Sequence, residues 1–427
     1  LSMISKDFHA SRRALYASVL KDDSVGFVFA GREREWKGDE MYPFIPYANF
    51  YYLTGFTYPE AVLMVVKRNG HVRETLFIDH PDEKAKRWTG VSYTKESVKE
   101  QTGIGNVDYL ERFEQAIPLF GEPGLIRQIY IDIPGWERPF VKNEAREFAS
   151  RLHDFDPTIP IYNTFQDLAY FRQVKTKEEI ALHRTACDIT AIGVKNILSH
   201  LRPGMHEYEI EAYFDFSLKS HHADHAFPTI AASGINACCM HYDANDRQME
   251  KGDLILFDLG ARWGGYNADV SRTFPVSGRF TEQQKALYEV VLKGLEVAIA
   301  ASKPGQPKNE LQDLSKQAMA KELIRLGIIQ EPEEINRYYF HGSGHYIGLY
   351  THDVGDDNAP LEEDMVFTLE PGLYFDDLGI GIRIEDTLLV TKDGCEVLSG
   401  GIPKTVEEIE TFMQEYAASN ETASLTV

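Results

Sequence analysis

The stretch from Gly252 to Gly260 limits what this chain can fold into more than any other segment. Leu254, Leu256 and Asp258 share one face of a predicted strand, and the opposite face is wholly apolar. Apolar residues on both faces indicate a strand that is buried on both sides. A carboxylate at the end of such a strand needs hydrogen-bond donors, a cation or a metal ion beside it. The segment therefore predicts a buried sheet that presents Asp258 to a polar site.

A second carboxylate follows a turn at Gly264-Gly265. Alternation in the next strand places Asn267, Asp269 and Ser271 on one face. The pattern predicts a hairpin with Asp258 on one strand and Asp269 on the other. Either aspartate alone is more simply explained as a turn cap or a surface residue.

Two more strands end in carboxylates. An apolar run reaches Glu370 just before Pro371, which cannot continue the hydrogen bonding of a strand. In the run that starts at Ile380, Arg383 and Glu385 share one face while isoleucines pack behind them. Each glutamate alone is more simply a salt-bridged strand end than a metal ligand.

The segment His341-Gly342-Ser343-Gly344-His345 places two histidines four residues apart. The helical zinc motif with this spacing needs a glutamate beside the first histidine, and none is present here. Each interior glycine costs about 1 kcal/mol in a helix relative to alanine. The segment is therefore predicted to be a loop or strand edge at which the backbone passes close to another group.

Taken together, these residues describe a metal centre better than a set of separate ion pairs. The four carboxylates contribute a charge of −4, which two divalent cations balance, whereas one cation would leave a costly −2 buried. His345 is the natural nitrogen donor. Oxygen-rich ligation with one imidazole suits Mn²⁺, Co²⁺ or Zn²⁺, and two-metal sites of this kind hold a bridging water or hydroxide at neutral pH.

Composition narrows the classes of partner. The chain has 44 Lys and Arg against 66 Asp and Glu, and its formal charge of −22 disfavours nucleic acids and anionic membranes as partners. No apolar run approaches the roughly 18 residues of a membrane span, and the first residues lack a signal-peptide pattern. The four cysteines form no C-x-x-C pair and no disulfide framework. We expect a soluble, cytoplasmic protein.

The two parts of the chain differ in their pattern. Up to about residue 165, strand-like and helical segments alternate, which predicts an α/β domain with a mostly parallel sheet. After a turn-rich break at 156–160, Thr176 and Glu179 have the spacing of a capping box at the start of a long helix. Further helices and antiparallel strands follow. The predicted domains are residues 1–165 and residues 166–427, the second of the α+β class.

The second part closely resembles the pita-bread metallopeptidases, which include aminopeptidase P, prolidase and, more distantly, methionine aminopeptidase. The segments that carry this resemblance are Asp258-Leu259-Gly260, Ala268-Asp269-Val270-Ser271-Arg272-Thr273-Phe274, His341-Gly342-Ser343-Gly344-His345, Thr351-His352-Asp353-Val354-Gly355, Glu370-Pro371-Gly372-Leu373-Tyr374 and Gly381-Ile382-Arg383-Ile384-Glu385-Asp386. In the first part, Phe50-Tyr51-Tyr52-Leu53-Thr54-Gly55-Phe56 with Pro59-Glu60-Ala61 is similar to the N-terminal domain of aminopeptidase P. The resemblance implies an α/β N-terminal domain and a pita-bread catalytic domain of the creatinase and methionine aminopeptidase type.

The resemblance also implies a ligand set for two metal ions, most simply Mn²⁺, with Co²⁺ or Zn²⁺ as alternatives. Asp258 would bind one ion, and Asp269 and Glu385 would bridge both. His345 and Glu370 would bind the second ion, and Glu370 would also take a proton from the bridging water.

Further residues resemble those that handle the substrate. His241 and His352 match histidines that stabilise the substrate and its scissile carbonyl, and His341 is expected to contact the substrate as well. Arg383 is expected to hold Asp258 in orientation, as groups behind a metal ligand commonly do.

By this resemblance we expect an Xaa-Pro aminopeptidase, which cleaves the bond between an N-terminal residue and a penultimate proline through attack of a metal-bridging hydroxide. Prolidase, which is restricted to Xaa-Pro dipeptides, is the alternative, because the link from Tyr374 to Gly381 is several residues shorter than the usual aminopeptidase P stretch. A catalytically inactive pita-bread binding protein is a remote alternative, since such relatives lose ligands that this chain keeps. The family implies a homodimer or homotetramer.

Two other groups of residues have simpler explanations. Three histidines and an aspartate lie between His221 and His225, where a solvated helix end accounts for them. Cys238 and Cys239 lie near His241 and suggest a thiol nucleophile, but free cysteines usually serve as small buried hydrophobic residues.

Overall fold

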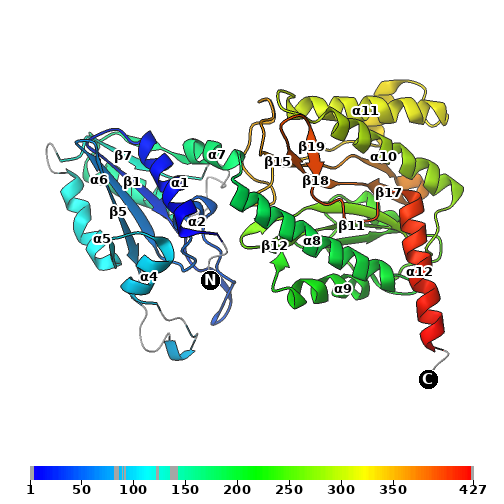
Figure 1. Ribbon diagram of the computed structural model, residues 1–427, viewed down its shortest axis with the longest axis horizontal. Helices are drawn as coiled ribbons and strands as arrows, with labels where there is room; N and C mark the ends of the chain where they lie inside the picture. The colour runs from blue at the N-terminus through cyan, green and yellow to red at the C-terminus, as the bar shows by residue number, and fades with distance from the viewer. Residues whose placement is uncertain are drawn as a thin grey trace. The chain divides into compact units, whose positions relative to one another are not determined.

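The computed structural model describes residues 4–80, 86–88, 90, 93–121, 125–134 and 143–424, which form two units that divide between Arg172 and Gln173 (Figure 1). The sequence pattern placed the boundary near residue 165, which is the first residue of helix α7 (Phe165–Gln173). All of this helix except its last residue belongs to the first unit.

The first unit is built on a six-stranded sheet of order β6-β5-β4-β1-β7-β8. The strands are β1 (Ser24–Phe29), β4 (Val62–Arg68), β5 (His71–Ile78), β6 (Val107–Tyr109), β7 (Gln128–Ile131) and β8 (Ile161–Asn163), with a separate hairpin of β2 (Glu35–Lys37) and β3 (Glu40–Met41). The helices are α1 (Lys6–Val19), α2 (Ala48–Thr54), α4 (Lys95–Thr102), α5 (Leu110–Ala116), α6 (Glu144–Phe155) and α7. On one face of the sheet, Phe27 of β1 packs against Phe113 of α5 and Phe148 of α6, with ring centroids 5.8 and 4.9 Å away.

The prediction of a mostly parallel sheet is confirmed, and one of the described strands, β4, departs from it. β1, β7 and β8 run parallel, as do β5 and β6, but β4 is antiparallel to both of its neighbours. The cause is the turn Asn69-Gly70 between β4 and β5, in which φ is 50° and 74°. A two-residue turn with positive φ at both positions can join only antiparallel strands.

The second unit contains several small sheets between two pairs of helices. The helices are α8 (Lys177–His200), α9 (Glu207–Ser220), α10 (Glu282–Ala301), α11 (Lys308–Arg325) and α12 (Val406–Ser424), with short 3₁₀ turns η2 (Gly234–Cys238), η3 (Pro332–Arg337) and η4 (Asp376–Leu378). The strands are β9 (Asp224–His225), β10 (Ile230–Ser233), β11 (Leu254–Leu259), β12 (Ala261–Trp263), β13 (Tyr266–Asn267), β14 (Val270–Pro275), β15 (Val366–Leu369), β16 (Gly372–Phe375), β17 (Ile380–Arg383), β18 (Asp386–Val390) and β19 (Cys395–Val397). In Figure 1, α8 and α9 lie on one side of these strands, and α10 and α11 lie on the other.

Helix α8 begins where the capping box predicted. The Thr176 hydroxyl accepts a hydrogen bond from the Glu179 backbone N–H at 3.4 Å, and the Glu179 carboxylate accepts one from the Thr176 N–H at 2.7 Å. These two bonds satisfy donors that the first turn of a helix otherwise leaves free.

The predicted hairpin of Asp258 and Asp269 is correct in its pairing and wrong in its second strand. β11 pairs directly with antiparallel β14, so that Asp258 lies opposite Ser271. The residues between them leave this sheet and form the small hairpin β12–β13, so Asp269 immediately precedes β14 instead of lying in one continuous strand. Gly260 permits the crossing, because a Cβ at this position would overlap the Ala268 carbonyl oxygen.

Candidate metal centre

The four predicted carboxylates all lie where a strand ends or the chain changes sheets. Asp258 is the penultimate residue of β11, and Asp269 directly precedes β14. Glu370 lies between β15 and β16, and Glu385 lies between β17 and β18. At such points the backbone is free of a regular pleat, so a side chain can turn toward a shared centre.

The structure brings Asp269, His345 and Glu385 together, with one potential ligand atom from each within 4.8 Å of the others. His345 Nε2 lies 3.2 Å from Asp269 Oδ2. Its other nitrogen, Nδ1, lies 3.1 Å from the Tyr346 carbonyl oxygen, which can only accept, so Nδ1 carries the proton. This arrangement leaves the lone pair of Nε2 directed at the carboxylates, as in many histidines that bind a metal.

The segment from His341 to His345 is not helical and runs against β15, as its glycines predicted. Gly344 has a φ of 145°, and a Cβ there would overlap the Thr368 carbonyl oxygen. The neighbouring His345 exchanges hydrogen bonds with Thr368, of 3.2 Å from its N–H to Oγ1 and 2.8 Å to its carbonyl. Glu370 is tied to the same segment, since its N–H donates to the Ser343 carbonyl at 2.8 Å.

Arg383 and Ser271 hold two of the carboxylates in place. The buried Arg383 guanidinium donates to Asp258 Oδ2 at 2.6 Å and to Ser271 Oγ at 2.7 Å. Ser271 in turn donates to Glu385 Oε2 at 2.9 Å. Asp258 and Glu385 therefore each accept a hydrogen bond from the protein through one carboxylate oxygen, and the other oxygen of each is left for a different partner.

The remaining oxygens are the clearest sign that a cation belongs here. Among the described residues, the buried Asp258 Oδ1, Asp269 Oδ1 and Glu385 Oε1 have no hydrogen-bond donor. Burial, and then the nearby Asp258, raise the pKa of Glu385 to about 6. Burial and the charge of Glu385 raise the pKa of Asp269 and of Glu370 well above the usual range. Crowded, desolvated carboxylates of this kind favour bound protons or bound cations, and the donor set fits divalent metal ions.

Two histidines lie beside this cluster. The His352 ring is 4.2 Å from the His345 ring between centroids, and burial and then the neighbouring His345 lower the pKa of His352. His341 Nδ1 donates to the Gly342 carbonyl at 2.6 Å, and its Nε2 accepts from the Tyr374 hydroxyl at 2.8 Å. Burial and the Arg383 charge lower the pKa of His341 to about 4, so this ring is neutral at neutral pH.

Sequence reasoning assigned no role to Tyr374, although it lies in a segment that carries the family resemblance. Arg383 donates a third hydrogen bond to the Tyr374 hydroxyl at 3.2 Å, which places this hydroxyl between Arg383 and His341. The link between Arg383 and Ser271 was also missed, although alternation had placed Ser271 on the same face as Asp269. His241 is exposed and follows η2, and it is the last of the neighbours that lower the pKa of His352.

The polar cluster at His221–His225 and the cysteine pair Cys238–Cys239 have local partners. His225 Nε2 lies 2.9 Å from Asp215, and Asp224 pairs with Arg262 at 3.1 Å. Burial and the neighbouring Asp376 raise the pKa of Cys238 to about 12, so this thiol is not a ready nucleophile.

Known proteins share this architecture over nearly the whole chain. Residues 9–124 match the aminopeptidase P N-terminal domain, and residues 181–392 match metallopeptidase family M24. The Xaa-Pro aminopeptidase of Haemophilus influenzae is 32% identical over 433 residues, which cover 97% of this chain and 98% of the relative. A Bacillus anthracis structure assigned as an aminopeptidase P is 41% identical with a TM-score of 0.94, covering 97% of this chain and 99% of that chain. The chain belongs to the aminopeptidase P family of metallopeptidases.

Membership of the aminopeptidase P family confirms the predicted fold, an α/β N-terminal domain followed by a pita-bread catalytic domain. Escherichia coli aminopeptidase P, solved with the inhibitor Pro-Leu, superposes with a TM-score of 0.89 at 30% identity and covers 97% of this chain and 99% of that chain. Within the described ranges, no helix is long and apolar enough to cross a membrane.

Proposed function

We propose that this chain is an Xaa-Pro aminopeptidase, which hydrolyses the bond between an N-terminal residue and a following proline. One observation carries the proposal. A buried cluster of carboxylates and one histidine, with oxygens left unpaired, lies in a chain that aligns end to end with relatives named for this activity.

Five residues would hold the metal ions of the centre. They are Asp258, Asp269, His345, Glu370 and Glu385. Two divalent ions bound there, most simply Mn²⁺ and otherwise Co²⁺ or Zn²⁺, would supply a Lewis acid for the scissile carbonyl and would lower the pKa of a water molecule.

The residues around the ions would transfer the proton, bind the peptide and hold the ligands in position. Glu370 would accept the proton of the attacking water, since burial and the charge of Glu385 raise the pKa of its carboxyl. His352 would donate to the oxygen of the scissile carbonyl as negative charge develops there. His241 and His341 would contact the peptide, and Arg383 would keep Asp258 in orientation through their 2.6 Å hydrogen bond.

The substrate class follows from the chemistry of proline. A peptide bond to proline has no N–H, so an enzyme that grips this donor cannot bind the substrate well. A pocket that selects the pyrrolidine ring solves this problem. We further propose a homodimer or homotetramer and a cytoplasmic location, which rest on the family resemblance and the composition.

Peptide length distinguishes this function from that of prolidase. We expect Xaa-Pro-Xaa peptides to be hydrolysed at least as well as Xaa-Pro dipeptides, because the N-terminal domain is of the aminopeptidase P type. The measurement is kcat/KM for a dipeptide and for the same dipeptide extended by several residues. If extension abolishes turnover, the enzyme is a prolidase, in keeping with its short link from Tyr374 to Gly381.

His352 should be needed for turnover but not for the metal ions. His352→Ala is expected to lower kcat by about 10²- to 10³-fold, because one donor to the developing oxyanion is lost. The metal content, measured on the same sample, should be unchanged. His221→Ala, which removes an exposed histidine at a helix end, serves as the control and should keep full activity. Loss of metal from His352→Ala would make His352 a ligand and contradict the assignment of His345.

A further inference from the structure

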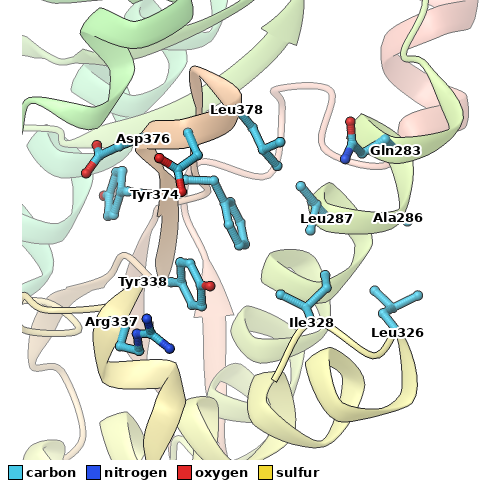
Figure 2. Close-up of a pocket in the computed structure, with 12 residues that line it drawn as sticks. Gln283, Ala286, Leu287, Leu326, Ile328, Arg337, Tyr338, Tyr374, Asp376 and Leu378 are labelled. Atoms are coloured by element: carbon cyan, nitrogen blue, oxygen red, sulfur yellow. The ribbon is translucent and has the colours of Figure 1, made fainter. Parts of the chain in front are cut away.

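A cavity with a volume of about 550 Å³ lies in the catalytic unit (Figure 2). It is open to solvent on one side and is lined by helix α10, the chain after α11, the end of η3, the end of β16 and the turn η4. The volume is within the range of sites that bind small organic molecules. Tyr374, which contacts His341 and Arg383, is its one lining residue that also contacts the residues of the metal centre described above.

One side of this cavity is apolar. Leu287, Leu326 and Ile328 lie together on this side in Figure 2. The rings of Tyr338 and Phe375 pack 4.6 Å apart between centroids and extend the apolar surface. This side would gain free energy by covering a hydrophobic side chain of a ligand.

The other side carries charges of both signs. Arg337 and Asp376 lie there in Figure 2, and Asp377 follows on the same turn. Arg337 is held only loosely, since its contact with Glu334 is 3.9 Å and its side chain is 72% exposed. Such a pair contributes little, so the guanidinium is available to an anionic group. Asp376 neighbours the Cys238 thiol, so Asp377 is the carboxylate available to a cationic group.

We propose that this cavity binds a free α-amino acid with an apolar side chain. The carboxylate of the ligand pairs with Arg337, its ammonium group pairs with Asp377 of η4, and its side chain lies against Leu287 and Ile328. A zwitterion with one apolar branch is the ligand whose charges and shape match both sides of the cavity. If the proposed hydrolysis is correct, such amino acids belong to the same class as the released N-terminal residue, but the binding itself does not depend on that activity.

The experiment is calorimetric titration of the metal-loaded, full-length protein with L-leucine. N-acetyl-L-leucine, which lacks the ammonium group, and L-leucinamide, which lacks the carboxylate, should each bind about tenfold more weakly or worse. L-Alanine lacks three of the buried carbons and should also bind about tenfold more weakly or worse. Equal affinity for leucine and both of its singly charged analogues would overturn the proposal.

Variants locate the binding. Ala286→Trp fills the cavity from one face of α10, and Arg337→Gln removes the guanidinium from an exposed position. Each should lower the affinity for L-leucine about tenfold or more. Their controls are Ala300→Trp on an exposed position of the same helix and Arg325→Gln on α11, which should bind as the wild type does.

If L-leucine binds equally well to Ala286→Trp and Arg337→Gln, it binds elsewhere, for example as a product at the metal centre, and the proposal is wrong. Absence of binding to the wild type has the same meaning. Because binding is measured without substrate, a failure of the proposed peptidase activity would leave these results interpretable.

Discussion

Asp269→Asn and Glu385→Gln are each expected to lower kcat/KM by about a thousandfold or more and to reduce the divalent metal that the protein retains. An amide keeps the shape of the carboxylate but removes the negative charge that would balance the cations. Both residues are buried, with 4% and 1% of their surface exposed, so water cannot take over this role. Metal content by mass spectrometry and kcat/KM for an Xaa-Pro-Xaa peptide measure the two effects.

Two exposed carboxylates supply matched controls. Asp188→Asn on α8 and Glu296→Gln on α10 make the same chemical change on the surface and should leave activity and metal unchanged. Wild-type protein that binds one ion per chain at saturating metal would contradict a two-ion centre. Full metal content in both Asp269→Asn and Glu385→Gln would contradict the ligand set itself.

Arg272→Met is expected to destabilise the catalytic unit by about 3 kcal/mol, because it leaves a buried charge without its main partner. Arg272 donates to Asp386 at 2.6 Å, and the two side chains are 1% and 0% exposed. Burial pushes the pKa of Asp386 up, but Arg272 and then Lys404 pull it below its usual range. For a unit of this size, the loss corresponds to a Tm lower by roughly 6–12 °C. Thermal denaturation followed by circular dichroism measures it.

Two further variants test whether the buried charge is the cause. Lys404→Met removes the other cation beside Asp386, but Lys404 is 22% exposed, so its effect should be smaller, at about 1 kcal/mol. Arg272→Met combined with Asp386→Leu removes both buried charges and should recover part of the lost stability. A double variant less stable than Arg272→Met would refute this account. Since Arg272 also donates to the Glu385 carbonyl oxygen, the single variant should bind metal more weakly as well.

Local patterns predicted local structure well in this chain. Thr176 directly precedes the helix and Glu179 lies in its first turn, so their spacing alone located its start. The glycine at position 344 predicted a close approach of the backbone, and Thr368 provides it. In the first case the structure depends on hydrogen bonds between residues close in sequence, and in the second it depends on the absence of a side chain at one position.

Relations between distant segments were harder to predict. Alternation indicates which face of a strand a side chain occupies, but it does not say which other strand lies beside that face. The contact of Asp269 with His345 depends on such neighbours, and the sequence supported it only through the family resemblance. The bond of Arg383 to Ser271 depends on them too and was missed. The role of Tyr374 was missed for the same reason. The antiparallel direction of β4, in contrast, has a local cause, because the Asn69-Gly70 sequence is typical of a tight turn between antiparallel strands.

The strands of the hairpin β16–β17 fix the positions of Arg383 and Tyr374, whatever the length of the turn η4 that joins the two strands. Backbone pairing places Gly372 opposite Arg383 and Tyr374 opposite Gly381, so the arginine and the tyrosine are aligned by the sheet and not by η4. Extra residues inserted within Asp376–Leu378 would change the wall of the neighbouring cavity while leaving the Arg383–Asp258 bond in place. This turn is therefore a suitable position at which to graft a reporter peptide or an affinity tag into a working enzyme.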